Sequence, residues 1–180
     1  MSRKLLAVAL AALFFLTGLT GLAEESAKEE TIAQLVLLME EFFADEGYHY
    51  DLDDNTFKLD FNLTGALPSC SVVVNVYYDS IEVISTPEVR ALETNKEKTA
   101  LFLTMLNYDI FYAQFGMKLQ NGAFYSRGVQ LVERTLPGLE EIDVLFHLTL
   151  NYLEKYGDQL VQVALAGADP YEVYERMKSE

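Results

Sequence analysis

The feature of this sequence that most constrains its fold is an alternation of apolar and polar residues between Tyr48 and Val83. A period of two residues places every second side chain on the same face of a β-strand, so this region predicts strands with one buried face. A two-residue turn at Asp54-Asn55 sets Leu52 opposite Phe57. In that register every apolar residue of the first strand meets an apolar partner on the second, which supports the pairing.

Two further strands complete a meander. Gly65 and Pro68 interrupt the alternation, and a third strand is expected from Ser69 to Tyr78. A tight turn at Asp79-Ser80 then sets Ile81 opposite Tyr78 and starts the fourth strand. The residues predicted to share the buried phase of the third strand are Val72, Val74, Val76 and Tyr78.

Helical periods flank these strands. A helix is expected over residues 29–46 and ends at Gly47. A second helix starts at Thr86-Pro87, or at Thr94 with Glu97 completing a capping box, and runs to about residue 106. Because residues 100–106 are apolar nearly all round, this helix is expected to be buried.

The C-terminal half predicts a hairpin followed by two helices. Strands over 114–120 and 123–131 are joined by Asn121-Gly122, a strong hairpin signal. A long helix follows Pro137-Gly138 and ends near Gly167, and Asp169-Pro170 caps a short last helix. The long helix carries one apolar stripe, made of Ile142, Phe146, Leu153, Leu160 and Ala164. The order α-β-β-β-β-α-β-β-α-α predicts an α+β fold.

The first 23 residues have the pattern of a secretory signal peptide. Arg3 and Lys4 precede an unbroken apolar run from Leu5 to Leu16, and small residues stand at Gly21 and Ala23. Cleavage there would leave residues 24–180 as a single domain with no membrane span, in the periplasm or outside the cell. The alternative is an uncleaved anchor, because the stretch from Leu5 to Ala23 is just long enough to span a bilayer.

Composition excludes several classes of protein. The chain has 28 acidic against 13 basic residues and a formal net charge of −15. Nucleic-acid binders need a basic surface, so such a partner is not expected. The single cysteine rules out a disulfide framework and a cysteine-rich zinc module.

Candidate catalytic and metal residues all have simpler structural explanations. Asp51, Asp53 and Asn55 match three positions of a calcium loop, but Thr56 stands where glycine is required and Asn62 where the bidentate glutamate belongs. These are also the residue types of a hairpin turn.

Cysteine chemistry is not expected either. The strand phase turns Cys70 toward the core, while His49 points outward and His147 lies on the polar side of the long helix. Paired carboxylates fall at helix ends and on solvated faces. We therefore expect no catalytic, cofactor or metal-binding residue.

A partner surface is the remaining candidate. Tyr77, Lys118, Tyr125 and Arg127 are predicted to lie on outward sheet faces, with Phe115, Met117, Leu119 and Phe124 on the buried face of the hairpin. Exposed tyrosine and arginine are favoured at interface hot spots. The alternative is an ordinary sheet surface.

The segments Leu103–Tyr108, Phe115–Leu119, Asn121-Gly122 and Tyr125–Arg127 together resemble the bacterial YbjN-like family. That resemblance implies the α+β fold of the type III secretion chaperones, with helices packed on a curved antiparallel sheet, and a tendency to form homodimers. The family is described loosely as sensory transduction regulators, without agreed catalytic residues. The expected function is an exported, non-enzymatic interaction module that binds a protein or peptide partner, with regulation as one use of that binding. The alternative is an extracytoplasmic hydrolase with an acidic site.

Overall fold

The structure, a computed structural model, is built on one open antiparallel sheet. It describes residues 3–133 and 135–179, and of residues 3–23 it describes the backbone alone. The six strands lie in the order β1-β2-β3-β4-β6-β5. Their bounds are β1 Asp51–Asp53, β2 Thr56–Asn62, β3 Ser69–Val76, β4 Ser80–Pro87, β5 Ala113–Lys118 and β6 Ala123–Leu131.

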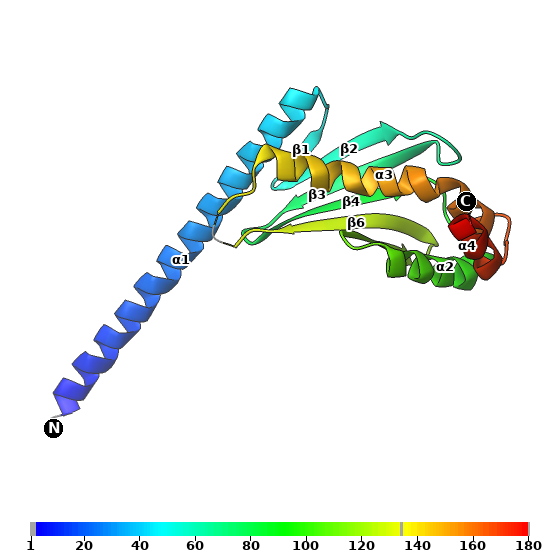
Figure 1. Cartoon of the computed structure of the whole chain (residues 1–180). Helices are drawn as coiled ribbons and strands as arrows, with labels where there is room; N and C mark the ends of the chain where they lie inside the picture. Colours follow the sequence, from blue (N-terminus) through cyan, green and yellow to red (C-terminus); the bar gives the residue numbers. More distant parts are fainter. Residues whose placement is uncertain (1–2, 134, 180) are drawn as a thin grey trace.

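Two helices cover one face of this sheet, and two others lie at its end. The helices are α1 (Arg3–Glu46), α2 (Lys96–Asp109), α3 (Leu139–Ala164) and α4 (Pro170–Ser179), with a 3-10 turn η1 at Glu93–Asn95. α3 crosses β4 and β6, and the C-terminal part of α1 packs on α3 and β3 (Figure 1). α2 lies along β5 and contacts α3 and α4. The predicted α+β architecture and element order are confirmed.

The helix predicted over residues 29–46 is the C-terminal part of α1. It ends at Glu46, and Gly47 follows with φ of 69°, as expected for a glycine that stops a helix. α1 extends toward the N-terminus as far as Arg3, away from the sheet (Figure 1). The side chains that would identify a signal peptide at residues 1–23 lie outside the described residues. Beyond that segment, the described chain contains no helix long and apolar enough to cross a membrane.

The register of the first hairpin is as predicted. Leu52 lies opposite Phe57, and Asp54 takes the positive φ of 58° that the turn requires. β1 is shorter than expected, so Tyr48 meets the second strand through its ring instead of a ladder pair. Its ring centroid lies 5.1 Å from that of Phe61.

The predicted turn between β3 and β4 is wrong by two residues. Val76, and not Tyr78, lies opposite Ile81. The connection is longer because the backbone N–H of Tyr77 donates to the carbonyl of Ser80 at 2.8 Å. A shift of two residues leaves every side chain on its predicted face, so Val76 and Ile81 are still buried. Tyr78 leaves the strand and is 46% exposed.

The predicted start of the second helix is also wrong. Thr86 and Pro87 are the last residues of β4, and α2 begins only at Lys96. Asn95 does not cap α2 through its side chain; its amide donates to the carbonyls of Ala164 and Leu165 at the end of α3. This contact between distant segments sets where the helix begins. The expectation of a helix buried all round fails too, because Leu101 is exposed.

In the second hairpin the side-chain faces are correct and the loop is longer than predicted. Lys118 lies opposite Ala123, so residues 119–122 form a four-residue loop. Gly122 has φ of 70°, whereas Leu119 lies in the loop and is exposed instead of joining the buried face. Phe115 and Phe124 are buried as expected.

Small side chains let α3 approach the sheet closely. The predicted stripe of α3 is buried throughout. Beneath it, the hydroxyls of Ser85 and Thr149 form a hydrogen bond of 2.7 Å. A Cβ on Gly128 would lie 2.9 Å from a methyl group of Leu145, so β6 has no room for a larger residue there. The core therefore lies between the sheet and the α1–α3 layer, and no helix of the described residues covers the opposite sheet face.

Candidate functional site

The residues predicted to bind a partner do not form one surface. Lys118, Tyr125 and Arg127 share the helix-free face of the β5–β6 hairpin. Tyr77 lies in the turn before β4 and bonds to Ser80 on the β3 side of β4, so β4 separates it from β6. The structure thus brings three of the four residues together and separates the fourth.

Arg127 has a partner within the sheet. Its Nε donates to Oε1 of Glu82, a carboxylate with a side chain only 12% exposed. The other oxygen of Glu82 accepts from the amide of Asn75 at 2.9 Å, and Asn75 accepts from the hydroxyl of Thr56 at 3.2 Å. We call these four residues, Thr56, Asn75, Glu82 and Arg127, the polar row. It crosses β2, β3, β4 and β6, and its Glu82 carboxylate offsets the charge of Arg127.

Tyr125 also has a structural role on this face. Its ring lies across Gly116 on β5, in the space that a Cβ at that position would occupy. A large aromatic ring over a strand glycine covers backbone that would otherwise be open to water. Tyr125 and Arg127 are therefore both engaged within the hairpin and its neighbours.

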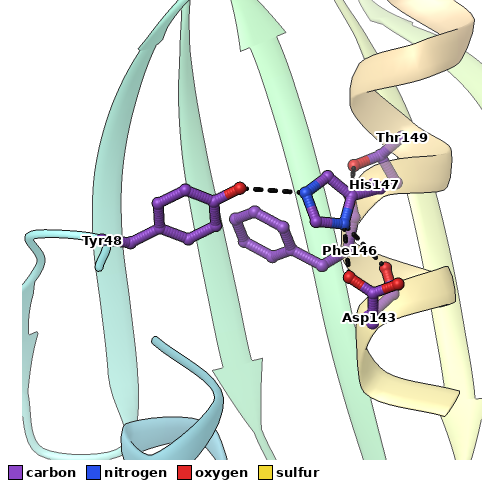
Figure 2. A network of polar contacts seen from close by, with 5 residues as sticks. All are labelled: Tyr48, Asp143, Phe146, His147 and Thr149. Carbon is purple, nitrogen blue, oxygen red and sulfur yellow. Dashed lines mark hydrogen bonds and ion pairs between the residues drawn. The ribbon is translucent and has the colours of Figure 1, made fainter. Parts of the chain in front are cut away.

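A polar network that the sequence did not predict joins Tyr48 to α3 (Figure 2). The Tyr48 hydroxyl lies 2.9 Å from Nε2 of His147, and Nδ1 of His147 lies 2.8 Å from Oδ1 of Asp143. Since a carboxylate only accepts, the proton on the imidazole belongs on Nδ1, and Nε2 accepts from the Tyr48 hydroxyl. His147 is thus partly buried and hydrogen-bonded, which its predicted position on the polar side of the helix did not indicate.

The chemistry of this network favours a structural tie. Its order of hydroxyl, imidazole and carboxylate is also that of a hydrolase triad. Burial raises the pKa of Tyr48, and the carboxylates of Glu46 and Asp143 raise it further, so the phenol keeps the proton that it donates to Nε2 of His147. The Tyr48 ring stacks on Phe146 with centroids 5.8 Å apart. The network therefore fastens the chain after α1 onto α3.

The other candidates also have local explanations. Asp53 forms an ion pair of 3.2 Å with Lys58, and the amide of Asn55 donates to the carbonyl of Val76, so the calcium-like segment is engaged as a turn. Cys70 is buried in the core, and His49 is exposed. Within the described part of the chain, no group of three or more potential ligands could hold a metal ion.

An apolar surface hollow, which we call the corner groove, lies next to Tyr112, the residue just before β5. It has a volume of about 550 Å³ between the last residues of β6 and the first turns of α3. Its apolar lining consists of Tyr112, Val129, Leu139, Val144, Leu145 and Leu148. Tyr112 is 80% exposed and Val144 59% exposed, so large apolar side chains face solvent here.

Two more exposed aromatic residues precede Tyr112 closely in the sequence. Phe111 is 88% exposed in the connection that leads from α2 to Tyr112, and Tyr108 is 83% exposed in the last turn of α2. A second hollow shares Gln130 and Glu141 with the groove and adds the exposed Leu131 and Leu136. A signal for this site in the sequence is the aromatic pair Phe111-Tyr112, which lies between a helix and a hairpin and stays exposed, while the preceding Ile110 is buried in the core.

Comparison with known proteins finds a similarity among solved structures. No protein-family model matches the chain, and no curated protein matches it. Among solved structures, it is similar to the crystal structure of YbjN from E. coli, a proposed transcription regulator, over 71% of this chain and 86% of that one. The identity is 12% and the TM-score 0.43. YbjN is also the family that the sequence motifs resemble, and the likeness concerns the fold alone.

Proposed function

We propose that this chain is an exported, non-enzymatic interaction module that binds a segment of a protein or peptide partner in the corner groove. The observation that carries the proposal is the exposure of Tyr112 and Val144 around an apolar hollow. Exposed apolar patches with a polar rim mark interaction sites in soluble proteins. Aromatic residues such as Tyr112 supply much of the binding energy at such interfaces.

The arrangement of the acidic residues supports binding over hydrolysis. A glycosidase-type site needs two carboxylates that face each other across a substrate. Here Glu141 turns back to accept from the backbone N–H of Gly138, and Glu82 is engaged by Arg127. The groove is wide and mainly apolar, which suits a peptide segment with anchoring side chains.

Site-specific photocrosslinking tests the binding site. A benzoylphenylalanine at position 112 replaces one exposed aromatic residue by another, and the same group at the exposed Tyr171 of α4 is the matched control. We expect a discrete crosslinked partner from position 112, not from position 171, which disappears when Val144→Ser is added. A partner captured from position 171 and not from position 112 would contradict this site.

Export and oligomeric state have separate tests. If the signal peptide is cleaved, mass spectrometry of the mature protein will find Glu24 at the N-terminus, in the periplasm or the medium. Recovery of Met1 or Ser2 would support the anchor instead. The homodimer expected from the family resemblance is tested by sedimentation, where a mass of a single chain would reject it.

A further inference from the structure

We propose that the occupant of the corner groove is a cationic amphipathic segment, with apolar side chains for the hollow and lysine or arginine at its flanks. This inference rests on the proposed function, because it names the chemistry of the partner for the same groove. The argument combines the apolar lining with the charge around it.

The described rim of the groove is acidic. Glu140 and Glu141 line it, and Glu133 and Glu141 line the adjoining hollow. The residues described in these linings include no lysine, arginine or histidine. None of the ion pairs found among the described residues uses Glu133 or Glu140, and both side chains are exposed. Among the described residues, therefore, no cation engages either carboxylate, and both are exposed toward a partner.

Glu140 lies at the end of the groove where α3 begins. Glu140 and Glu141 occupy the first turn of α3, where the exposed backbone N–H groups of a helix stabilise anions. The apolar wall stands beside this turn, since Val144 and Leu148 follow at the four-residue spacing of one helix face. A segment seated on that wall would have its ends close to the carboxylates.

The same charges argue against a second copy of the chain as the occupant. A second copy would also have a net charge of −15 and the same acidic rim. In a twofold contact through the groove these rims would face each other, and like charges brought together oppose association. A cationic segment meets complementary charge instead, which increases its rate of association.

Synthetic peptides with one apolar core and different flanks test this inference. Three fluorescent peptides carry the same leucine and phenylalanine residues at helical spacing, flanked by lysine, glutamine or glutamate. Binding to the full chain is measured by fluorescence anisotropy. At about 50 mM salt we expect the lysine-flanked peptide to bind about tenfold more tightly than the glutamate-flanked one, and the ratio to shrink at about 1 M salt, where the screening length falls to about 3 Å.

Two double variants connect that preference to the groove. Glu133→Gln with Glu140→Gln should remove most of the preference for lysine over glutamine flanks. Glu172→Gln with Glu175→Gln makes the same change in net charge at exposed positions of α4 and should preserve the preference. If both double variants lower the preference for lysine flanks equally, the preference comes from net charge alone, and the inference is overturned.

The remaining outcomes separate the two proposals. Equal binding of all three peptides, lost in Val144→Ser, would overturn the cationic preference and leave a peptide-binding groove. Self-association that Val144→Ser abolishes, without peptide binding, would identify a second copy as the occupant and overturn the inference. If no peptide binds, the cationic segment is rejected, and crosslinking from position 112 still decides the proposed function independently.

Discussion

The side-chain amide of Asn107 pairs with the backbone of Phe115. Its Nδ2 donates to the Phe115 carbonyl at 2.8 Å, and its Oδ1 accepts from the Phe115 N–H at 2.7 Å. β5 is an edge strand, so these two backbone groups have no strand partner on that side. One amide of α2 thus supplies the pair of hydrogen bonds that another strand would make, and it holds α2 along the edge of the sheet.

Replacing Asn107 should therefore destabilise the domain. Asn107→Leu removes both hydrogen bonds and leaves a partly buried N–H and carbonyl unpaired, so we expect a loss of about 2–4 kcal/mol in the free energy of unfolding. Thr104→Leu, at an exposed position of the same helix, should change it by about 0.5 kcal/mol at most. Urea denaturation measures both, and equal midpoints would show that the amide pair contributes nothing.

Two glycines with the same backbone conformation should respond differently to alanine. Gly122 and Gly47 have φ of 70° and 69°, so each alanine is strained by about 1–2 kcal/mol. A Cβ at Gly47 meets nothing within 4 Å, whereas one at Gly122 would collide with the carbonyl oxygen of Ala91. We expect Gly122→Ala to destabilise the fold clearly more than Gly47→Ala in urea denaturation. Equal losses would mean that the backbone of Ala91 moves aside freely.

The buried thiol should make stability fall at high pH. Burial raises the pKa of Cys70 from 9.0 to about 12. The folded chain therefore keeps this proton after the unfolded chain has lost it, so the contribution is complete below pH 9.0 and is lost as the pH rises toward about 12. Between pH of about 8 and about 10.5, the free energy of unfolding should fall more in the wild type than in Cys70→Ala. Parallel pH profiles would contradict this account.

The two cations of the hairpin face should also differ. Arg127→Glu places a second carboxylate against the nearly buried Glu82, and we expect a loss of about 1–2 kcal/mol in the free energy of unfolding. Lys118→Glu changes an exposed side chain and should have an effect within about 0.5 kcal/mol. Thermal denaturation of both variants measures the difference, and an unaffected Arg127→Glu would show that the polar row is dispensable.

The hairpin face as a partner site stays a prediction. Because Arg127 also supports the fold, Lys118→Glu is the cleaner test of that site. The measurement is the amount of partner protein that the wild type and the variant capture side by side. If Lys118→Glu captures no partner while its thermal midpoint and the corner groove are unchanged, an acidic partner binds this face. If the variant captures as much partner as the wild type, Lys118, Tyr125 and Arg127 are ordinary sheet surface.

Local patterns determined the element types and the faces of the strands. A two-residue period depends only on adjacent residues, so the buried positions of β2, β3 and β6 could be predicted without knowing their neighbours. Gly47, Gly122 and Gly167 have positive φ where the sequence suggested breaks, because few other residues adopt that conformation without strain.

Tertiary contacts decided the turn lengths, the start of α2 and the site. A shift of two residues leaves the faces unchanged, so strand phase alone could not distinguish the registers of Tyr78 and Val76. Asn95 begins α2 where it does because it binds the end of α3, 69 positions away. Tyr48 and His147 are separated by 99 positions and meet only when α3 folds over the sheet. The corner groove forms in the same way, because it depends on where β5 begins relative to α3, a relationship between elements that no local pattern specifies.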